Sequence, residues 1–149
     1  MAPIKEWFGL YNVIFGWFES KYGSKALEEY YRYLAENCFD DVIEKFRIHG
    51  LQGIKDYYEH TFDIDQGEYD SEMLEDEFLF TVKKCPDYQF MLSSENQYFK
   101  PMKNYCKHHE IINSVICENS GHCFRMLECD GKGECRWSFR RGGASNDGT

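Results

Sequence analysis

Apolar residues recur at helical spacing through the first sixty positions of the chain, and this spacing predicts four helices. The apolar positions of the first two are Trp7, Leu10, Tyr11, Ile14 and Phe18, followed by Leu27, Tyr30, Tyr31 and Leu34. Gly23 and Ser24 have the chemistry to end the first helix and begin the second. A third helix is expected over 40–48 and a fourth from Gly50 onward.

The second half of the chain changes to shorter apolar runs with strand character. The segment from Asp63 to Asp76 is acidic and weakly patterned, so we expect an exposed connection there. After it, the expected elements are a first strand at Phe78–Val82, helices at Asp87–Leu92 and about Met102–Cys117, and a β-hairpin at about Cys123–Phe139. The hairpin is expected because Gly131 and Gly133 provide turn chemistry between two alternating runs.

This order of elements predicts an α+β fold, in which N-terminal helices pack on a small antiparallel sheet that includes the C-terminal β-hairpin. One domain is expected over residues 1–140, because a chain of 149 residues suits a single core. The last residues, 141–149, are rich in Gly, Ser and Asn, and a disordered tail is expected there.

Two registers of the hairpin place its cysteines differently. With a two-residue turn, Met126 faces Trp137, and Cys129 points to the opposite face from Cys135. With a three-residue turn, Leu127 faces Trp137, and Cys129 lies across from Cys135. One residue of slip therefore decides whether the two thiols can share a ligand, and the sequence leaves both registers open.

The charge of the chain limits the partners to consider. Acidic residues outnumber basic ones by 26 to 17, a net charge of −9, so no nucleic-acid partner is expected. No run of eighteen apolar residues is present, so no membrane partner is expected. Without a convincing export signal, the cytoplasm is the expected location. The seven cysteines are then thiols, metal ligands or redox groups rather than a disulfide framework.

The cysteines of the C-terminal third indicate a metal site. A hairpin brings thiols that are remote in the sequence together, and zinc often takes three cysteines with a histidine or carboxylate. The candidate ligands are Cys106, Cys129 and Cys135, with Glu128 or His109. The chain contains no CxxC pair, and free cysteines are often small buried hydrophobes, so packing is the alternative role.

A thiol beside a histidine also indicates nucleophilic catalysis. Cys106 and His109 are three residues apart and share a face of the expected helix. Cys85 stands just before an expected helix start, where the helix dipole lowers the pKa of a thiol. In this interpretation Cys85 or Cys106 is the nucleophile and His109 is the general base. Packing is the alternative for Cys85, and an exposed polar position is the alternative for His109.

Aromatic residues form 17% of the chain, so the core or a cavity wall must be rich in rings. We expect the rings between Trp7 and Tyr58 to pack as the core of the helices. A cavity with aromatic walls is compatible with this pattern, because ligand sites are mostly apolar with few polar groups.

Several short motifs carry a resemblance to a known family. Lys84-Cys85-Pro86 follows a β-prone run, Tyr105-Cys106 comes later, and a Gly-x-x-x-Cys segment ends in Arg-Trp-Ser-Phe. With Lys21-Tyr22-Gly23 before an amphipathic helix, these motifs resemble the L-2-amino-thiazoline-4-carboxylate hydrolase-like family over about residues 5 to 140.

The resemblance implies hydrolytic opening of a cyclic, amidine-like thiazoline, which is a step toward cysteine. In that family an acidic residue follows the cysteine of the segment that matches Cys106. Here His109 stands in that place, so the chain departs from the family pattern at a position close to the expected chemistry.

The C-terminal part is also similar to small-molecule-binding domains of the four-vinyl-reductase type. Those domains carry a glutamate and cysteines around a hairpin, and some use them to hold zinc beside a pocket for an aromatic ligand. The matching residues are Cys106, Glu128, Cys129 and Cys135. The hairpin here is shorter between its two cysteines than in that pattern.

The sequence therefore predicts a small-molecule-handling domain with a cysteine-centred site that includes a zinc ion as one alternative. The first interpretation is a hydrolase-like activity on a C–N bond of a cyclic amidine. The second is a non-catalytic, zinc-containing ligand-binding or sensor domain. A third gives the cysteines a packing role only, with a partner bound through the aromatic helices.

Overall fold

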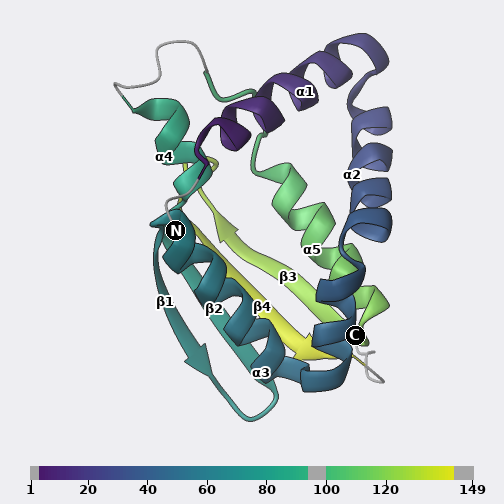
Figure 1. Cartoon of the computed structure of the whole chain (residues 1–149), viewed down its shortest axis with the longest axis vertical. Helices are drawn as coiled ribbons and strands as arrows, with labels where there is room; N and C mark the ends of the chain where they lie inside the picture. Colours follow the sequence, from purple (N-terminus) through teal and green to yellow (C-terminus); the bar gives the residue numbers. More distant parts are fainter. Residues whose placement is uncertain (1–3, 94–99, 143–149) are drawn as a thin grey trace.

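The computed structural model describes residues 4–93 and 100–142 (Figure 1). Within them the fold is α+β, as predicted, with helices that precede and cover an antiparallel sheet. The helices are α1 (Glu6–Tyr22), α2 (Ser24–Cys38), α3 (Asp40–Asp65), α4 (Pro86–Leu92) and α5 (Lys107–Asn119). The strands are β1 (Glu68–Met73), β2 (Glu77–Lys84), β3 (His122–Cys129) and β4 (Cys135–Arg141).

The sheet has the order β1-β2-β4-β3, so the β1–β2 and β3–β4 hairpins meet along β2 and β4. Strand β2 alternates between buried and partly exposed positions, which is typical of a strand with one covered face. Phe78, Phe80 and Val82 point to the buried side, and Trp137 and Phe139 of β4 extend the same surface.

Helix α3 covers β1, β2 and β4, while α5 packs on β3 (Figure 1). Ile54, Tyr58 and Phe62 of α3 bury their side chains against the sheet, and Val115 and Ile116 of α5 do the same. The main core therefore lies between one face of the sheet and these two helices.

A second cluster forms where α1 and α2 meet α4 and α5, around Phe15, Tyr31 and Tyr105. The apolar face expected for α1 is wrong, because the buried positions of this helix lie about one residue after the expected ones. Phe8 and Phe15 are buried, whereas Trp7 and Leu10 are 49% and 45% exposed. The cause is that α1 is apolar over more than one face, so spacing alone did not identify the face that packs.

Backbone conformation sets two of the helix boundaries. The expected third and fourth helices are the two parts of α3, separated as predicted at Gly50, whose φ of 62° and ψ of −144° are not helical. Helix α5 begins at Lys107 rather than at Met102. Asn104 has a positive φ of 62°, which a helix cannot accommodate, and the residues before α5 form turns instead.

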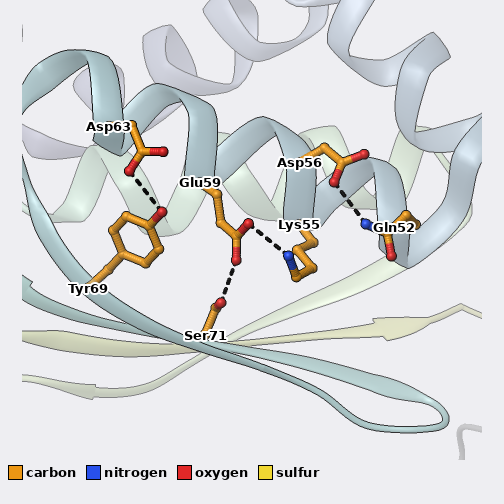
Figure 2. A network of polar contacts seen from close by, with 7 residues as sticks. All are labelled: Gln52, Lys55, Asp56, Glu59, Asp63, Tyr69 and Ser71. Carbon is orange, nitrogen blue, oxygen red and sulfur yellow. Dashed lines mark hydrogen bonds and ion pairs between the residues drawn. The ribbon is translucent and has the colours of Figure 1, made fainter.

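The expected exposed connection over 63–76 was wrong. Helix α3 continues to Asp65, and β1 follows, which makes the expected first strand the second one. Strand β1 pairs with β2, and Figure 2 shows polar side chains that also connect it to α3. The Tyr69 hydroxyl donates to Asp63 Oδ1 at 2.9 Å, and the Ser71 hydroxyl donates to Glu59 Oε1 at 2.5 Å. Glu59 also pairs with Lys55 at 2.8 Å.

The C-terminal hairpin uses both of the predicted registers, one at each end. Met126 pairs with Trp137, as the two-residue turn requires, while Cys129 pairs with Cys135, as the three-residue turn requires. A bulge between Met126 and Glu128 absorbs the difference, because it adds one residue to β3 alone. Core packing around Trp137 sets the register in the part of the hairpin away from the turn. The turn itself sets the register beside Cys129 and Cys135.

Strand β4 continues to Arg141, which pairs with His122, so the expected tail begins later than position 141. The rest of that expectation, 143–149, lies outside the described residues. Among the helices of the described ranges, none combines the length and apolar character needed to span a bilayer.

Candidate functional site

A cavity of about 660 Å³ lies between α1, α3, α5 and the end of the sheet where β2 leads into α4. Its volume is in the range of sites for small organic molecules. Most of its wall is apolar, and both α1 and α3 contribute rings. The Phe, Tyr and Trp residues of the wall are Trp7, Phe8, Tyr11, Phe15, Phe39, Tyr57, Tyr58, Phe62 and Trp137.

One end of the cavity carries polar side chains from three segments. Cys85 follows β2, Asp87 lies in the first turn of α4, and His109 belongs to the first turn of α5. A ligand atom from each of the three lies within 4.8 Å of the other two. The backbone N–H of Cys85 donates to the carbonyl oxygen of Gly133 at 3.1 Å, which ties this corner to the hairpin turn.

Asp87 is held in place from the segment before α5. The Tyr105 hydroxyl donates to Asp87 Oδ2 at 3.0 Å, and both side chains are buried. His108 Nδ1 lies 2.5 Å from the carbonyl oxygen of Tyr105, so the ring of His108 is fixed as well. Nε2 of His109 lies 3.7 Å from Asp87 Oδ2, which is too long for a hydrogen bond.

Burial disfavours the charged forms of the groups at this polar end. It raises the pKa of Asp87 above its ordinary value, and it lowers the pKa of His109 to about 4. The expected lowering of the Cys85 pKa by the helix dipole is wrong: burial raises the pKa of this thiol well above its usual range, and the nearby Asp87 adds to that rise. At neutral pH His109 therefore has an unprotonated ring nitrogen, suited to accept a proton or to bind a metal ion.

The thiols of the sequence prediction meet here. Cys106 and Cys135 line the cavity together with Cys85, and Cys129 lies beside Cys106 near the turn. Burial raises the pKa of Cys106 to about 12, and the neighbouring Cys129 thiol contributes to this. Burial likewise raises the pKa of Cys135 to about 12. The thiols of Cys85, Cys106 and Cys135 are therefore protonated at neutral pH when no metal ion is bound.

The predicted hairpin ligand set is not assembled as a metal site. Glu128 is exposed and lines neither of the two hollows that Cys106 lines. Across residues 4–93 and 100–142, the one group of three ligand atoms within 4.8 Å is that of Cys85, Asp87 and His109. The zinc that the four-vinyl-reductase resemblance implies therefore does not fit the hairpin residues in this arrangement.

Three buried side-chain nitrogen atoms lack a hydrogen-bond partner in the described part of the chain, and all three line this cavity. They are His109 Nε2, Asn113 Nδ2 and Trp137 Nε1. The nearest protein acceptor for the Trp137 indole N–H is the Cys135 sulfur, a weak acceptor whose pKa this contact lowers against the larger effect of burial. Asn113 is 6% exposed and Trp137 is 2% exposed, so water reaches neither freely. The Oδ1 atom of Asn113 accepts from the Tyr58 hydroxyl at 2.8 Å, which leaves only its amide N–H groups unpaired.

Asp87, Asn113 and Trp137 belong to this site, although sequence reasoning did not single them out. Asp87 follows Cys85 by two residues at a helix start, and that spacing was a usable signal. Nothing local marks Asn113 or Trp137, because their unpaired N–H groups result from tertiary packing.

Charge is almost absent from the cavity wall. Its described residues include no Lys or Arg, and its carboxyl groups are Asp65 and Asp87. Burial raises the pKa of Asp65 too, with a further contribution from Asp87. A buried anion would therefore meet no cationic partner here, and its desolvation would not be offset.

Comparison of the chain with models of protein families, with curated proteins and with solved structures gives no match. The resemblances drawn from short motifs thus stay predictions, and the geometry of the cavity carries the functional argument.

Proposed function

We propose that the chain binds an uncharged, largely apolar small molecule in this cavity, with a hydrogen-bond acceptor of the ligand facing Asn113 and Trp137. The observation that carries the proposal is the gathering of unpaired, buried N–H donors on one wall of an otherwise apolar cavity.

The unpaired donors favour an acceptor on the ligand. An indole Nε1 and an amide Nδ2 can only donate, and leaving such a group buried and unpaired costs about 1–3 kcal/mol. A ligand carbonyl or ether oxygen would satisfy both Trp137 and Asn113. Such a site discriminates between two molecules of the same shape when one of them lacks the oxygen.

The wall also favours a ligand without negative charge. Aromatic side chains from α1 and α3 provide apolar contact area, whereas the described wall residues include no Lys or Arg to offset a negative charge on the ligand. A carboxylate on the ligand is therefore expected to weaken binding, even when the rest of the molecule is unchanged.

A matched ligand pair tests the proposal. Benzophenone and diphenylmethane have nearly the same shape, but only benzophenone carries a carbonyl oxygen. Calorimetric titration of the purified chain should show benzophenone binding about tenfold more tightly. 4-Benzoylbenzoate, which adds a carboxylate, should bind more weakly than benzophenone.

Variants locate the effect within the cavity. Trp137→Phe and Asn113→Leu should each reduce the preference for benzophenone over diphenylmethane. Trp17→Phe is the matched control, because Trp17 is 55% exposed and lies outside the cavity wall. Equal affinities for the two compounds in the unmodified chain would refute the proposal.

A second candidate function, hydrolysis of a cyclic amidine, is favoured by a different observation. Cys106 lies on the wall of the main cavity and also lines a second hollow of about 640 Å³ on its other side. That hollow is more polar, and its lining is mainly acidic: Lys107 pairs with Glu110, and Glu19, Glu28 and Asp130 also line it. It would therefore suit the positively charged amidine group of a substrate. His109 shares the wall of the main cavity with Cys106 and would be the proton acceptor, as a weak base because its pKa is lowered to about 4.

Incubation with 2-aminothiazoline-4-carboxylate tests the hydrolytic reading, with the ring-opened product measured by mass spectrometry. In this reaction water attacks C2 of the thiazoline and the ring C2–N3 bond breaks, so that C2 becomes the carbonyl carbon of an S-carbamoyl group. His109 accepts the proton of the attacking water, and the ring nitrogen leaves as the protonated amine. Turnover by the unmodified chain that is lost in His109→Ala and kept in His60→Ala is the supporting result. Absence of product above the rate in buffer would remove this candidate.

A further inference from the structure

The polar end of the cavity has the spacing of a metal site. Zinc takes nitrogen and oxygen ligands at about 2.0–2.2 Å and thiolates at about 2.3 Å, so a tetrahedral site places ligand atoms roughly 3.3–3.8 Å apart. His109 Nε2 and Asp87 Oδ2 are separated by 3.7 Å. Cys85 completes a group whose members all lie within 4.8 Å of one another. Small side-chain movements would close the group around one ion.

We propose that Cys85, Asp87 and His109 bind a zinc ion, with the fourth coordination position open to the cavity. The donor set of thiolate, carboxylate and imidazole matches the ligands that zinc uses in proteins. All three residues line the cavity, so a position left free by the protein faces the space in which a small molecule would bind.

The charges of the three ligands suit a buried zinc ion. A thiolate and a carboxylate together offset the two positive charges of zinc, and the neutral imidazole adds none. The loaded site is therefore close to neutral, which an apolar cavity without Lys or Arg on its described wall can accommodate. A site with three thiolates would carry a net negative charge in the same surroundings.

The neighbours of the three ligands hold them in place. The Tyr105 hydroxyl donates to Asp87, and Cys85 donates its backbone N–H to Gly133 of the hairpin turn. Outer partners of this kind orient metal ligands, and their loss costs about 10–100-fold in affinity. The Nε2 atom of His109 has no other partner among the described residues, so zinc binding would also satisfy a buried polar atom.

The zinc site is independent of the proposed ligand specificity, because it rests on other residues. Asn113 and Trp137 select the ligand acceptor, whereas the metal lies beside them at the polar end. A zinc ion with an open position polarises a bound oxygen or activates water. Failure to bind zinc would not affect the proposed preference for benzophenone. Equal affinities for benzophenone and diphenylmethane would likewise not affect the zinc proposal.

Zinc and cobalt titrations of the full chain test the inference. The purified chain is treated with a chelator under reducing conditions and titrated with zinc against a chromophoric competitor. One zinc ion should bind per chain. Cobalt in place of zinc should give charge-transfer absorption from a single thiolate, because only Cys85 supplies sulfur.

Variants identify the ligands. Tyr105→Phe removes an outer partner and should weaken zinc binding by about tenfold. Cys85→Ala and Asp87→Asn remove a ligand, so each should weaken zinc binding by more than about 100-fold, the upper cost of losing an outer partner. Cys135→Ser and Asp65→Asn are the matched controls, since both residues line the cavity outside the group of three. These two variants should keep the affinity of the unmodified chain.

Three results would overturn the inference. The first is no stoichiometric zinc in the unmodified chain. The second is zinc lost in Cys135→Ser but kept in Cys85→Ala. The third is a cobalt spectrum of the unmodified chain with no thiolate or with several, and this result decides the question even where a variant fails to fold.

Discussion

Single cysteines in this chain differ in role because their burial differs. Cys117 is fully buried in the main core, Cys38 is exposed, and Cys85 lies at the polar end of the cavity. A thiol in an apolar core behaves as a small hydrophobic side chain. The seven cysteines therefore do not form one functional class.

A serine at a buried cysteine position brings a hydroxyl into apolar surroundings. Cys117→Ser should lower the free energy of unfolding by about 1–3 kcal/mol, because the hydroxyl loses water without a well-placed partner. Cys38→Ser should change it by no more than about 0.5 kcal/mol. Urea denaturation under reducing conditions measures both, and equal midpoints for the two variants would contradict the assignment.

Part of the candidate site could be predicted from single residues, and part could not. The approach of Cys106 to the hairpin thiols followed from the turn chemistry around Gly131 and the expected helix before it. The burial of Asp87 did not follow, since an acidic residue in a first helical turn is ordinarily exposed and interacts with the helix dipole. Its hydrogen-bond donor, Tyr105, lies 18 residues away in the sequence.

At the scale of elements, partners remote in sequence decided what local patterns left open. The acidic run after α3 has little strand character, yet β1 forms there because it pairs with β2 and because Tyr69 and Ser71 donate to α3. Helix α4 could be predicted locally, because Pro86 at its first turn is a signal for a helix start. Similarly, Gly50 marked the break in α3.

Strands β2 and β4 are joined by a charged pair whose strength depends on pH. Glu77 lies across from Arg140, whose Nε donates to Glu77 Oε2 at 3.0 Å, and the Ser138 hydroxyl also donates to this carboxylate. The hydrogen bond from Arg140, followed by the one from Ser138, lowers the pKa of Glu77. A lowered pKa means that this stabilisation is present above the unfolded pKa of roughly 4.3 and is lost as the pH falls through the folded pKa.

Glu77→Gln should therefore cost about 1 kcal/mol of stability at pH 7 and clearly less at pH 3. The matched control is Glu75→Gln, an exposed position in the turn between β1 and β2, which should have little effect at either pH. Chemical denaturation at the two pH values measures the difference. A cost for Glu77→Gln that is the same at pH 3 and pH 7 would show that the charge of Glu77 is not involved.

At the scale of the whole molecule, the sheet core and the α1–α2 cluster are connected. Tyr88 and Ile112 pack against both clusters, and the cavity lies along the same boundary. We therefore expect the two clusters to unfold together. A single cooperative unit keeps α1 in place over the cavity, which a ligand site between two layers requires.

Phe80→Ala tests this connection. Phe80 is fully buried and contacts the rings of Phe62, Tyr69 and Trp137, so its loss should cost about 3–5 kcal/mol. Tyr33→Ala, at a position that is 60% exposed, is the control and should cost little. Hydrogen exchange should report the same loss of protection in α2 as in β2. Protection of α2 that is unchanged in Phe80→Ala would mean that the two clusters unfold separately.

Photolabelling with benzophenone tests the central claim most directly. On irradiation its carbonyl inserts into nearby C–H bonds, and mass spectrometry then identifies the labelled peptides. The account predicts labels in α3, α5 and β4 around Tyr58, Asn113 and Trp137, which decrease when diphenylmethane competes for the cavity. Labels confined to the exposed face of α1, around Leu10 and Trp17, would contradict it.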